Sequence, residues 1–266
     1  SGKDCFVLFD LLDGLMLEFG YHGQSFVSAG PEVVFSRVPT DNDLGGTRLP
    51  SETNKRNKIP FLPIWNGAGT WFVQEMKHYE EGQAHVVYIH AELPAIGAHV
   101  EVQFHVYEDD KINVSYMYTP GDQAEAYAFM PRFGTKWVLA PGLDQLEWYG
   151  RGLDETYVDR AVEPIGIYQQ SVSDNWTEYS RPQENGNHID TRWLKVYGKE
   201  GYGLKFTGKI PFAFGANHYT KSSVMQASYS YQLKAQKETF LNIDHKQMGI
   251  GGYDSWSPNA LPQKEY

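Results

Sequence analysis

The residues best suited to bind a ligand lie near the C-terminal end of the sequence. Residues 249–258 combine three glycines, an aspartate, two serines and a tryptophan. Glycine allows strained turns and Pro258 cannot continue a strand ladder, so Trp256 is expected on irregular backbone. An indole presented there offers a flat face to a sugar ring, and Asp254 and Ser255 supply hydrogen-bonding groups beside it. We weigh this interpretation equally against a tryptophan that is simply buried under the loop.

A second polar group lies closer to the N-terminus. Residues 37–45 place Asp41, Asn42 and Asp43 in a row, shortly before a pair of glycines. Side chains of this type bond nearby backbone N–H groups, so a rigid turn is the favoured interpretation. A Ca²⁺-binding EF-hand loop would need alternating ligands that end in a bidentate glutamate. No glutamate stands at the required distance, which excludes that kind of calcium site.

Two further segments combine charged residues with glycines. Residues 147–160 mix carboxylates with Arg151 and a second arginine. They predict either an acid–base site or a network of arginine–carboxylate pairs that pins a loop, and we favour the network. Residues 182–188 form a polar segment with an Asn-Gly turn. Glu184, His188 and Arg151 are weaker candidates for a substrate contact, and a lone histidine is more often a hydrogen-bonded structural residue.

Several familiar kinds of active site are missing from the sequence. It contains no H-E-x-x-H zinc motif, no G-x-S-x-G nucleophile motif and no phosphate-binding P-loop. The single cysteine, Cys5, excludes a disulfide within the chain and a thiolate metal cluster. A retaining glycosidase needs two carboxylates about 5–5.5 Å apart, and the sequence marks no such pair.

Charge and composition narrow the possible partners. The net charge of −10 over 266 residues argues against a nucleic-acid backbone and against an anionic membrane surface. No apolar run approaches the length that spans a bilayer. One cysteine fits a cytoplasmic protein without excluding a periplasmic one. The chain starts Ser1-Gly2 without an initiating methionine, which predicts a segment of a longer protein.

Alternating apolar and polar residues dominate the chain and predict strands. Residues 100–106 and 112–118 alternate in this way on either side of Asp109-Asp110, which predicts a hairpin. The other strands are expected at residues 70–79 and 84–92, as a second hairpin, and at residues 229–233 and 239–243.

The order of these elements predicts the fold class. Only residues 222–227 favour a short helix, and strands with hairpin turns but no interleaved helices indicate an antiparallel all-β fold. No linker divides the chain, so one domain is expected over residues 1–266. Residues 45–63 hold glycines, prolines and basic side chains, and a loop this long is usually functional or disordered.

The motifs together resemble a known family. They occur in order at residues 39–45 (PTDNDLG), 149–152 (YGRG), 155–160 (ETYVDR), 182–186 (PQENG), 241–244 (LNID) and 249–256 (GIGGYDSW). Together they resemble the small-chain domain of glycoside hydrolase family 2 β-galactosidases, over about the whole chain.

The resemblance implies a fold and a division of labour. It implies an antiparallel supersandwich, similar to galactose mutarotase, as the last of five domains. It implies that the catalytic glutamates and the Mg²⁺ ligands lie in a separate TIM barrel, so this chain is expected to hold no catalytic residue and no cofactor. It implies that Trp256 packs against a galactoside, with Asp254 and Ser255 beside it and the turn at Asp41 and Asn42 facing the same pocket.

Two features depart from the family pattern, and two rival functions remain open. Residues 45–63 differ from the family in length and content, and the chain stops at Tyr266, where one more strand is expected. A stand-alone sugar 1-epimerase would need a general-base carboxylate and a general-acid histidine across one groove, with Glu184, His188 and His218 as the candidates. A carbohydrate-binding or assembly module is the other rival. The favoured partners are a galactoside and the other domains of the parent enzyme.

Overall fold

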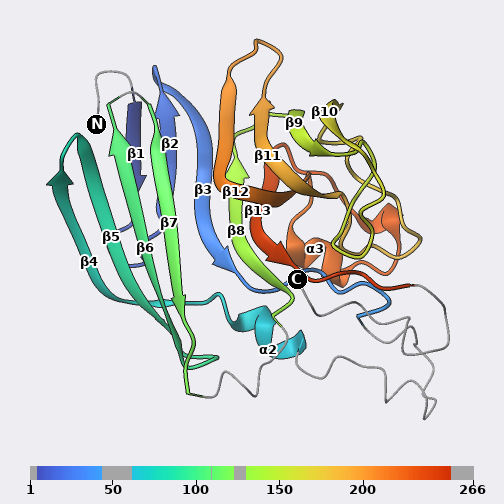
Figure 1. Ribbon diagram of the computed structural model, residues 1–266, viewed down its shortest axis with the longest axis horizontal. Helices are drawn as coiled ribbons and strands as arrows, with labels where there is room; N and C mark the ends of the chain where they lie inside the picture. Colours follow the sequence, from blue (N-terminus) through green and yellow to red (C-terminus); the bar gives the residue numbers. More distant parts are fainter. Residues whose placement is uncertain (1–4, 44–61, 109, 123–129, 253–266) are drawn as a thin grey trace.

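A computed structural model describes residues 5–43, 62–108, 110–122 and 130–252 of the chain. Within these residues the protein is almost entirely β-structure, arranged in a larger and a smaller antiparallel sheet (Figure 1). The predicted antiparallel all-β class is therefore confirmed, and the two sheets are consistent with a sandwich. The closer likeness to the mutarotase supersandwich and the single domain over residues 1–266 stay predictions.

The larger sheet has nine described strands in the order β1-β2-β3-β8-β13-β12-β11-β9-β10. These strands are β1 (Cys5–Phe9), β2 (Met16–Tyr21), β3 (Gln24–Val34), β8 (Arg132–Leu139), β9 (Gln145–Arg151), β10 (Ile165–Ser171), β11 (Asn187–Tyr197), β12 (Gly203–Asn217) and β13 (Thr239–Gln247). The smaller sheet is a meander of β4 (Phe72–Glu81), β5 (Ala84–Leu93), β6 (Ala98–Tyr107) and β7 (Ile112–Thr119).

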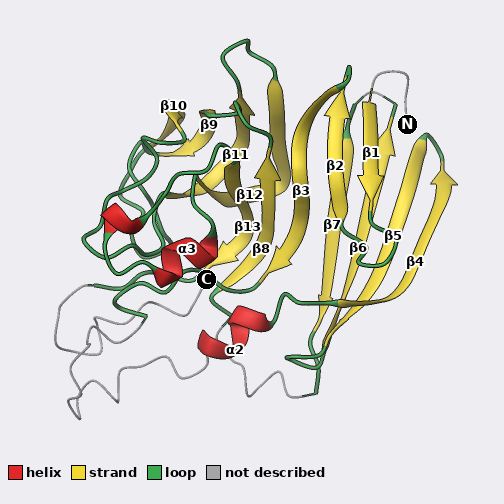
Figure 2. Cartoon of the chain, turned by 180° about the vertical axis from the view of Figure 1, so that it is seen from behind, coloured by secondary structure: helices red, strands yellow, loops and turns green. Residues whose placement is uncertain are grey.

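The smaller sheet packs against the first strands of the larger one, as the two opposite views agree (Figures 1 and 2). The rings of Phe9 on β1 and Phe104 on β6 meet edge to face, with centroids 4.9 Å apart. Phe35, directly after β3, contacts Tyr118 on β7 and Trp65 at centroid distances of 5.4 and 6.0 Å. These aromatic contacts close one hydrophobic core between the sheets.

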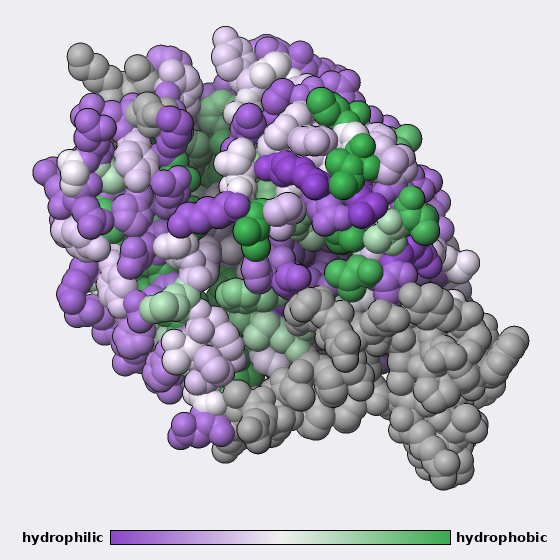
Figure 3. Space-filling model, viewed as in Figure 1, coloured by the Kyte–Doolittle hydropathy of each residue, from purple (hydrophilic) through white to green (hydrophobic). Residues whose placement is uncertain are grey.

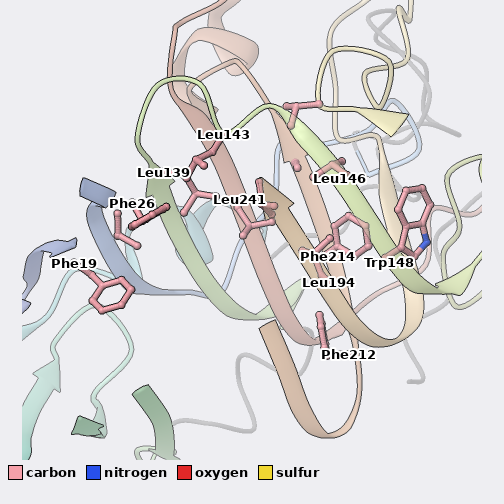
Figure 4. Packing of buried hydrophobic residues seen from close by; sticks show 14 of the residues in the cluster. Phe19, Phe26, Leu139, Leu143, Leu146, Trp148, Leu194, Phe212, Phe214 and Leu241 are labelled. Atoms are coloured by element: carbon pink, nitrogen blue, oxygen red, sulfur yellow. The ribbon is translucent and has the colours of Figure 1, made fainter. Parts of the chain in front are cut away.

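A second hydrophobic core extends along the larger sheet, from β1, β2 and β3 to β9, β11 and β12 (Figure 4). Leu194 on β11 is the register partner of Trp148 on β9, and both are fully buried. Phe214 on β12 packs against the same indole at a centroid distance of 5.6 Å. Because side chains alternate across a strand, the neighbours of these residues point to the opposite face of the sheet.

Both predicted hairpins are confirmed. In the first, β6 pairs with β7 in the register His99↔Thr119. In the second, β4 pairs with β5 and continues to Glu81, so its turn is shorter than expected from the sequence. Gly82 takes a φ of 61° in that turn, a left-handed conformation that favours glycine.

The C-terminal third contains one correct and one wrong prediction. The helix expected at residues 222–227 is α3 (Lys221–Gln226), whose N-cap Thr220 accepts a hydrogen bond from Ser223 N–H. The strand expected at residues 229–233 is wrong, because a 3-10 helix forms there (Ser230–Gln232). The Gln232 side chain accepts hydrogen bonds from the N–H groups of residues 228 and 229, which closes the chain locally instead of extending it.

One helix has no counterpart in the sequence-based expectations. Helix α2 (Leu62–Gly67) begins inside the predicted loop at residues 45–63, and its Trp65 is only 2% exposed. Residues 45–61 of that predicted loop lie outside the described part of the chain. No helix among the described residues is long and apolar enough to cross a bilayer.

Candidate functional site

The Asx-rich segment forms a rigid turn directly after β3, as predicted. Arg37 and Asp43 make a bidentate ion pair, with N–O distances of 3.0 and 2.8 Å, and both side chains are almost fully buried. Asp43 also accepts a hydrogen bond from Thr40 N–H at 2.9 Å, and Thr40 Oγ1 accepts one from Asp43 N–H at 3.1 Å. Burial would lower the pKa of Arg37, but the Asp43 carboxylate raises it, so the guanidinium stays charged.

This turn is fastened to the segment that follows β13. Arg37 donates to the carbonyl oxygens of Met248 and Gly249, each at 2.7 Å. Asn42 Nδ2 donates to the carbonyl oxygen of Ile250 at 2.8 Å. Figure 1 shows the two segments side by side at the same end of the larger sheet. Three consecutive carbonyl groups, at residues 248 to 250, are therefore held by one turn more than two hundred residues away in sequence.

The same segment is held from its N–H side by a different loop. Asp159 accepts hydrogen bonds from Ile250 N–H at 2.9 Å and Gly251 N–H at 2.8 Å. A Cβ at Gly249 would lie 2.1 Å from a carboxylate oxygen of Asp159, so glycine is needed for this close approach. Gly251 and Gly252 take φ values of 67° and 90°, which favour glycine. We call Arg37, Asn42 and Asp159 the backbone clamp of residues 248–251.

A buried ionic network lies beside the clamp. Glu184 pairs with Arg132 and also accepts a hydrogen bond from Val38 N–H at 3.3 Å. Arg132 forms a second ion pair, with Asp244 at 3.0 Å. Burial raises the pKa of Asp244 to about 7, against the opposing effect of Arg132. A Cβ at Gly134 would lie 1.9 Å from Asp244 Oδ1, so a neighbouring glycine makes room for this carboxylate.

The remaining motif, at residues 182–186, joins these groups together. Gln183 Oε1 accepts a hydrogen bond from Asp41 N–H at 2.9 Å, and Arg181 pairs with the Asp41 carboxylate at 2.5 Å. Glu155 accepts a hydrogen bond from Gly186 N–H at 2.9 Å. Five of the six motif segments that carry the family resemblance, all except residues 149–152, therefore contribute to one connected network, up to residue 252.

Arg151 belongs to a separate network that pins a loop, as favoured from the sequence. Its Nε pairs with Asp190 at 2.6 Å. Its Nη1 donates to the carbonyl oxygens of Ala161 and Glu163 at 3.0 and 2.9 Å. These bonds hold the loop between β9 and β10 against the start of β11. The guanidinium is thus occupied by the protein's own groups.

The structure does not support an epimerase groove. His188 is fully buried between the rings of Trp148 and Phe214, and its Nε2 lies 2.7 Å from Asn175 Oδ1. Burial lowers the pKa of His188 to about 4, so its imidazole is neutral at neutral pH. A sugar cannot reach this ring, which sits in the core as a structural histidine.

The other two candidate groups for epimerisation are engaged elsewhere. His218 Nδ1 lies 2.9 Å from the carbonyl oxygen of Glu238. Glu184 lines a cavity of about 60 Å³ together with Arg132 and Lys221, and His188 does not line it. A space of this size holds a few water molecules rather than a sugar ring.

The family comparison is consistent with the convergence of these motifs. The family described as β-galactosidase small chain matches residues 1–266. The chain belongs to this family. It is 30% identical to the β-galactosidase of Halalkalibacterium halodurans over 96% of the chain, and 29% identical to that of Streptococcus thermophilus over 96%. It is 28% identical to the β-galactosidase of Priestia megaterium over 98% of the chain.

The relatives are much longer than this chain. The matched region makes up 25% of the Halalkalibacterium protein and 24% of each of the other two. The chain therefore spans about a quarter of the length of the curated relatives it matches. It corresponds to one part of each of these longer β-galactosidases.

The candidates from the sequence divide into three groups. Asp41 and Asn42 lie on the clamped turn, with Asp41 at the surface and Asn42 partly buried. Glu184, His188 and Arg151 serve the internal networks described above. Trp256, Asp254 and Ser255 lie outside the described residues, and their contact with a sugar stays a prediction.

Two results remain for this end of the molecule: whether it can bind a metal ion, and whether the sequence predicted the backbone clamp. Among the described residues, no group of three or more His, Cys, Asp or Glu side chains could hold a metal ion. The clamp itself was not predicted, although Asn42 and Asp159 lie in the motifs at residues 39–45 and 155–160 and Arg37 lies two residues before the first of them. The nearest signal in the sequence was the run of glycines at residues 249–252, since glycine marks a close approach of other atoms to the backbone.

Proposed function

We propose that this chain is the non-catalytic C-terminal domain of a β-galactosidase and contributes a sugar-contacting loop to its active site. The parent enzyme hydrolyses terminal β-D-galactosides with retention, using two glutamates and a Mg²⁺ site in a separate barrel domain. One observation carries the proposal: the backbone clamp fixes residues 248–251, which lead directly into the Asp254-Ser255-Trp256 motif.

The clamp suits a positioning role. Backbone groups at four consecutive residues are held by buried or half-buried side chains from two other loops, so the segment that follows β13 is fixed up to residue 251. A rigidly held contact lowers the entropy cost of binding, because less of the loop has to be ordered when the sugar arrives. Binding energy from that contact then orients the glycosidic bond for catalytic groups held elsewhere.

Replacement of Trp256 by alanine in the parent enzyme tests the proposal. An aromatic stacking contact worth about 1–3 kcal/mol predicts that KM rises by roughly tenfold or more. The change in kcat should be smaller, because the lost contact would mostly bind ground state and transition state alike. Tyr231→Ala, which removes a ring that is 79% exposed, is the matched control and should leave KM unchanged.

The outcome that contradicts the proposal is a loss of stability without a change in KM, since that result would make Trp256 a packing residue. A second measurement addresses the rival functions. The isolated chain should neither hydrolyse a nitrophenyl β-galactoside nor accelerate the interconversion of galactose anomers. Hydrolysis of the galactoside or faster anomer interconversion by the pure chain would contradict the proposal, because it would show that the catalytic groups lie in this domain.

A further inference from the structure

A second surface that could bind a ligand lies on the outer face of strands β9, β11 and β12. Trp193 on β11 is the register partner of Tyr149 on β9, and their ring centroids are 6.5 Å apart. One step of two residues further along β11, Lys195 has Glu147 on one side and Lys205 on the other as register partners. We call these five residues the basic–aromatic face.

The face is far from the backbone clamp. β11 begins near the motif at residues 182–186 and carries Lys195 close to its other end, roughly 26 Å further along the strand. Figure 1 shows the hairpin between β11 and β12 projecting at that end, away from the segment after β13. A ligand on this face would therefore be independent of the proposed function.

The charge of this hairpin is opposite to that of the whole chain. Residues 192–209 contain five basic residues and one acidic residue, whereas the chain carries a net charge of −10. Figure 3 shows strongly hydrophilic and apolar side chains interspersed at the surface on the side of the molecule that carries β9 to β11. Such a local excess of positive charge in an acidic protein favours an anionic partner at this position.

The two lysines of the face are placed where their positive charges repel each other, which lowers the stability of the sheet. Lys195 and Lys205 are directly opposite each other on neighbouring strands, and like charges in this arrangement are destabilising. Their Nζ atoms lie 5.0 and 5.6 Å from the centroid of the same indole, that of Trp193. Lys195 is neutralised by Glu147 at 2.5 Å, but no carboxylate of the described residues pairs with Lys205.

The face also has room for a ligand. A shallow groove of about 310 Å³ runs beside these residues and is lined by Glu147, Lys195, Tyr197 and Lys205, among others. This volume is at the lower end of the range for small-molecule sites. The groove therefore combines the ammonium group of Lys205, the ring of Tyr197 and the carboxylate of Glu147, and the rings of Trp193 and Tyr149 lie on the neighbouring same-face pair of β11 and β9.

We propose that the basic–aromatic face binds an acidic saccharide, whose carboxylate or sulfate pairs with Lys205 while its ring packs against Trp193 and Tyr149. The unpaired lysine selects for negative charge. The two rings select for a sugar over a simple ion, because an apolar sugar face can be buried against them. The overall acidity of the chain disfavours a nucleic acid as the ligand.

Titration calorimetry on the 266-residue chain tests this site, with trigalacturonate as the acidic probe and galactotriose as its neutral counterpart. We expect trigalacturonate to bind more tightly than galactotriose. Lys205→Gln should weaken trigalacturonate binding at least fivefold, and Trp193→Leu should weaken it as well. Lys77→Gln is the matched control, because it removes the same charge from an exposed lysine on the smaller sheet.

Three results would overturn the proposal. They are no detectable binding of trigalacturonate, an equal loss in Lys77→Gln and Lys205→Gln, and equal binding of polyglutamate with no effect of Trp193→Leu. The fold of the key variant can be checked separately. Since Lys205→Gln removes a like-charge pair, its melting temperature without ligand should be equal to or above that of the wild type.

Discussion

Replacement of Arg37 by methionine should destabilise this protein more than removal of any surface arginine. The guanidinium makes two bonds to Asp43 and one each to the carbonyl oxygens of Met248 and Gly249. Methionine keeps much of the volume but removes every one of these donors. Asp43 is then left as a buried charge whose remaining described partner is the N–H group of Thr40.

The expected magnitude follows from this burial. Removing one partner of a buried ion pair costs about 3–5 kcal/mol, because the other charge is left uncompensated. For a chain of this size each kcal/mol lowers the melting temperature by about 2–4 °C, so a decrease of roughly 10 °C is expected. The double variant Arg37→Met/Asp43→Asn should be more stable than Arg37→Met alone, because the stranded charge is gone.

The assay is thermal and urea unfolding of the 266-residue chain, followed by tryptophan fluorescence. Arg181→Met is the matched control, since Arg181 also pairs with an aspartate, Asp41, but their side chains are 23% and 60% exposed. Exposed pairs of this kind contribute about 0–1 kcal/mol. Equal and small effects of Arg37→Met and Arg181→Met would refute the reasoning, because they would show that the buried pair is not stabilising the turn.

Three further predictions concern the networks behind the clamp. Gly134→Ala should cost about 1–3 kcal/mol of unfolding free energy, because its Cβ would overlap Asp244, whereas Gly67→Ala meets open space and should not destabilise the chain in urea. His188→Gln should remove a stability loss of up to about 3 kcal/mol that the wild type shows between pH 6.5 and pH 4, where the folded state binds fewer protons than the unfolded state. As the pH rises from about 4 to about 7, Asp244→Asn should gain a few kcal/mol of stability relative to wild type, because over that range the raised pKa of Asp244 makes the wild-type folded state bind more protons than the unfolded state. An unchanged pH profile in either variant would contradict the assignment of that group.

The parts of the fold that were predictable are those set by local periodicity. β6 alternates between buried and less buried residues over its first eight positions, and β7 alternates between half-buried and exposed residues throughout, so the pattern is visible over eight residues in each. The same rule failed at residues 229–233, where Tyr229 and Tyr231 alternate but are 52% and 79% exposed. Alternating residues favour a strand only where one face of the strand is buried. Here neither tyrosine is buried, and the hydrogen bond that the Gln232 side chain accepts from the backbone stabilises a short helix instead.

Tertiary contacts decided the features that the sequence did not predict. Helix α2 is six residues long, too short to be stable alone, and packs through Trp65 on Phe35 from another part of the chain. The clamp joins Arg37 to residues 248 and 249 across 211 and 212 positions, and Asp159 to residues 250 and 251 across 91 and 92. No spacing rule covers such separations. The motifs could be recognised one by one, but their meeting point required the fold.

The residues of the clamp hold the segment after β13, and they are different from the residues that are proposed to contact a ligand. The hydrogen bonds from Arg37, Asn42 and Asp159 to residues 248–251 all go to backbone groups, so these bonds do not require particular side chains at those residues. Glycine is required at position 249 because the Asp159 carboxylate occupies the space of a Cβ. Substitutions that alter the clamp should therefore change how firmly the following loop is held, whereas substitutions at residues 253–258 should change what the loop contacts. Under the proposed function, the first kind acts on a sugar through the position of the loop, and the second acts on it directly.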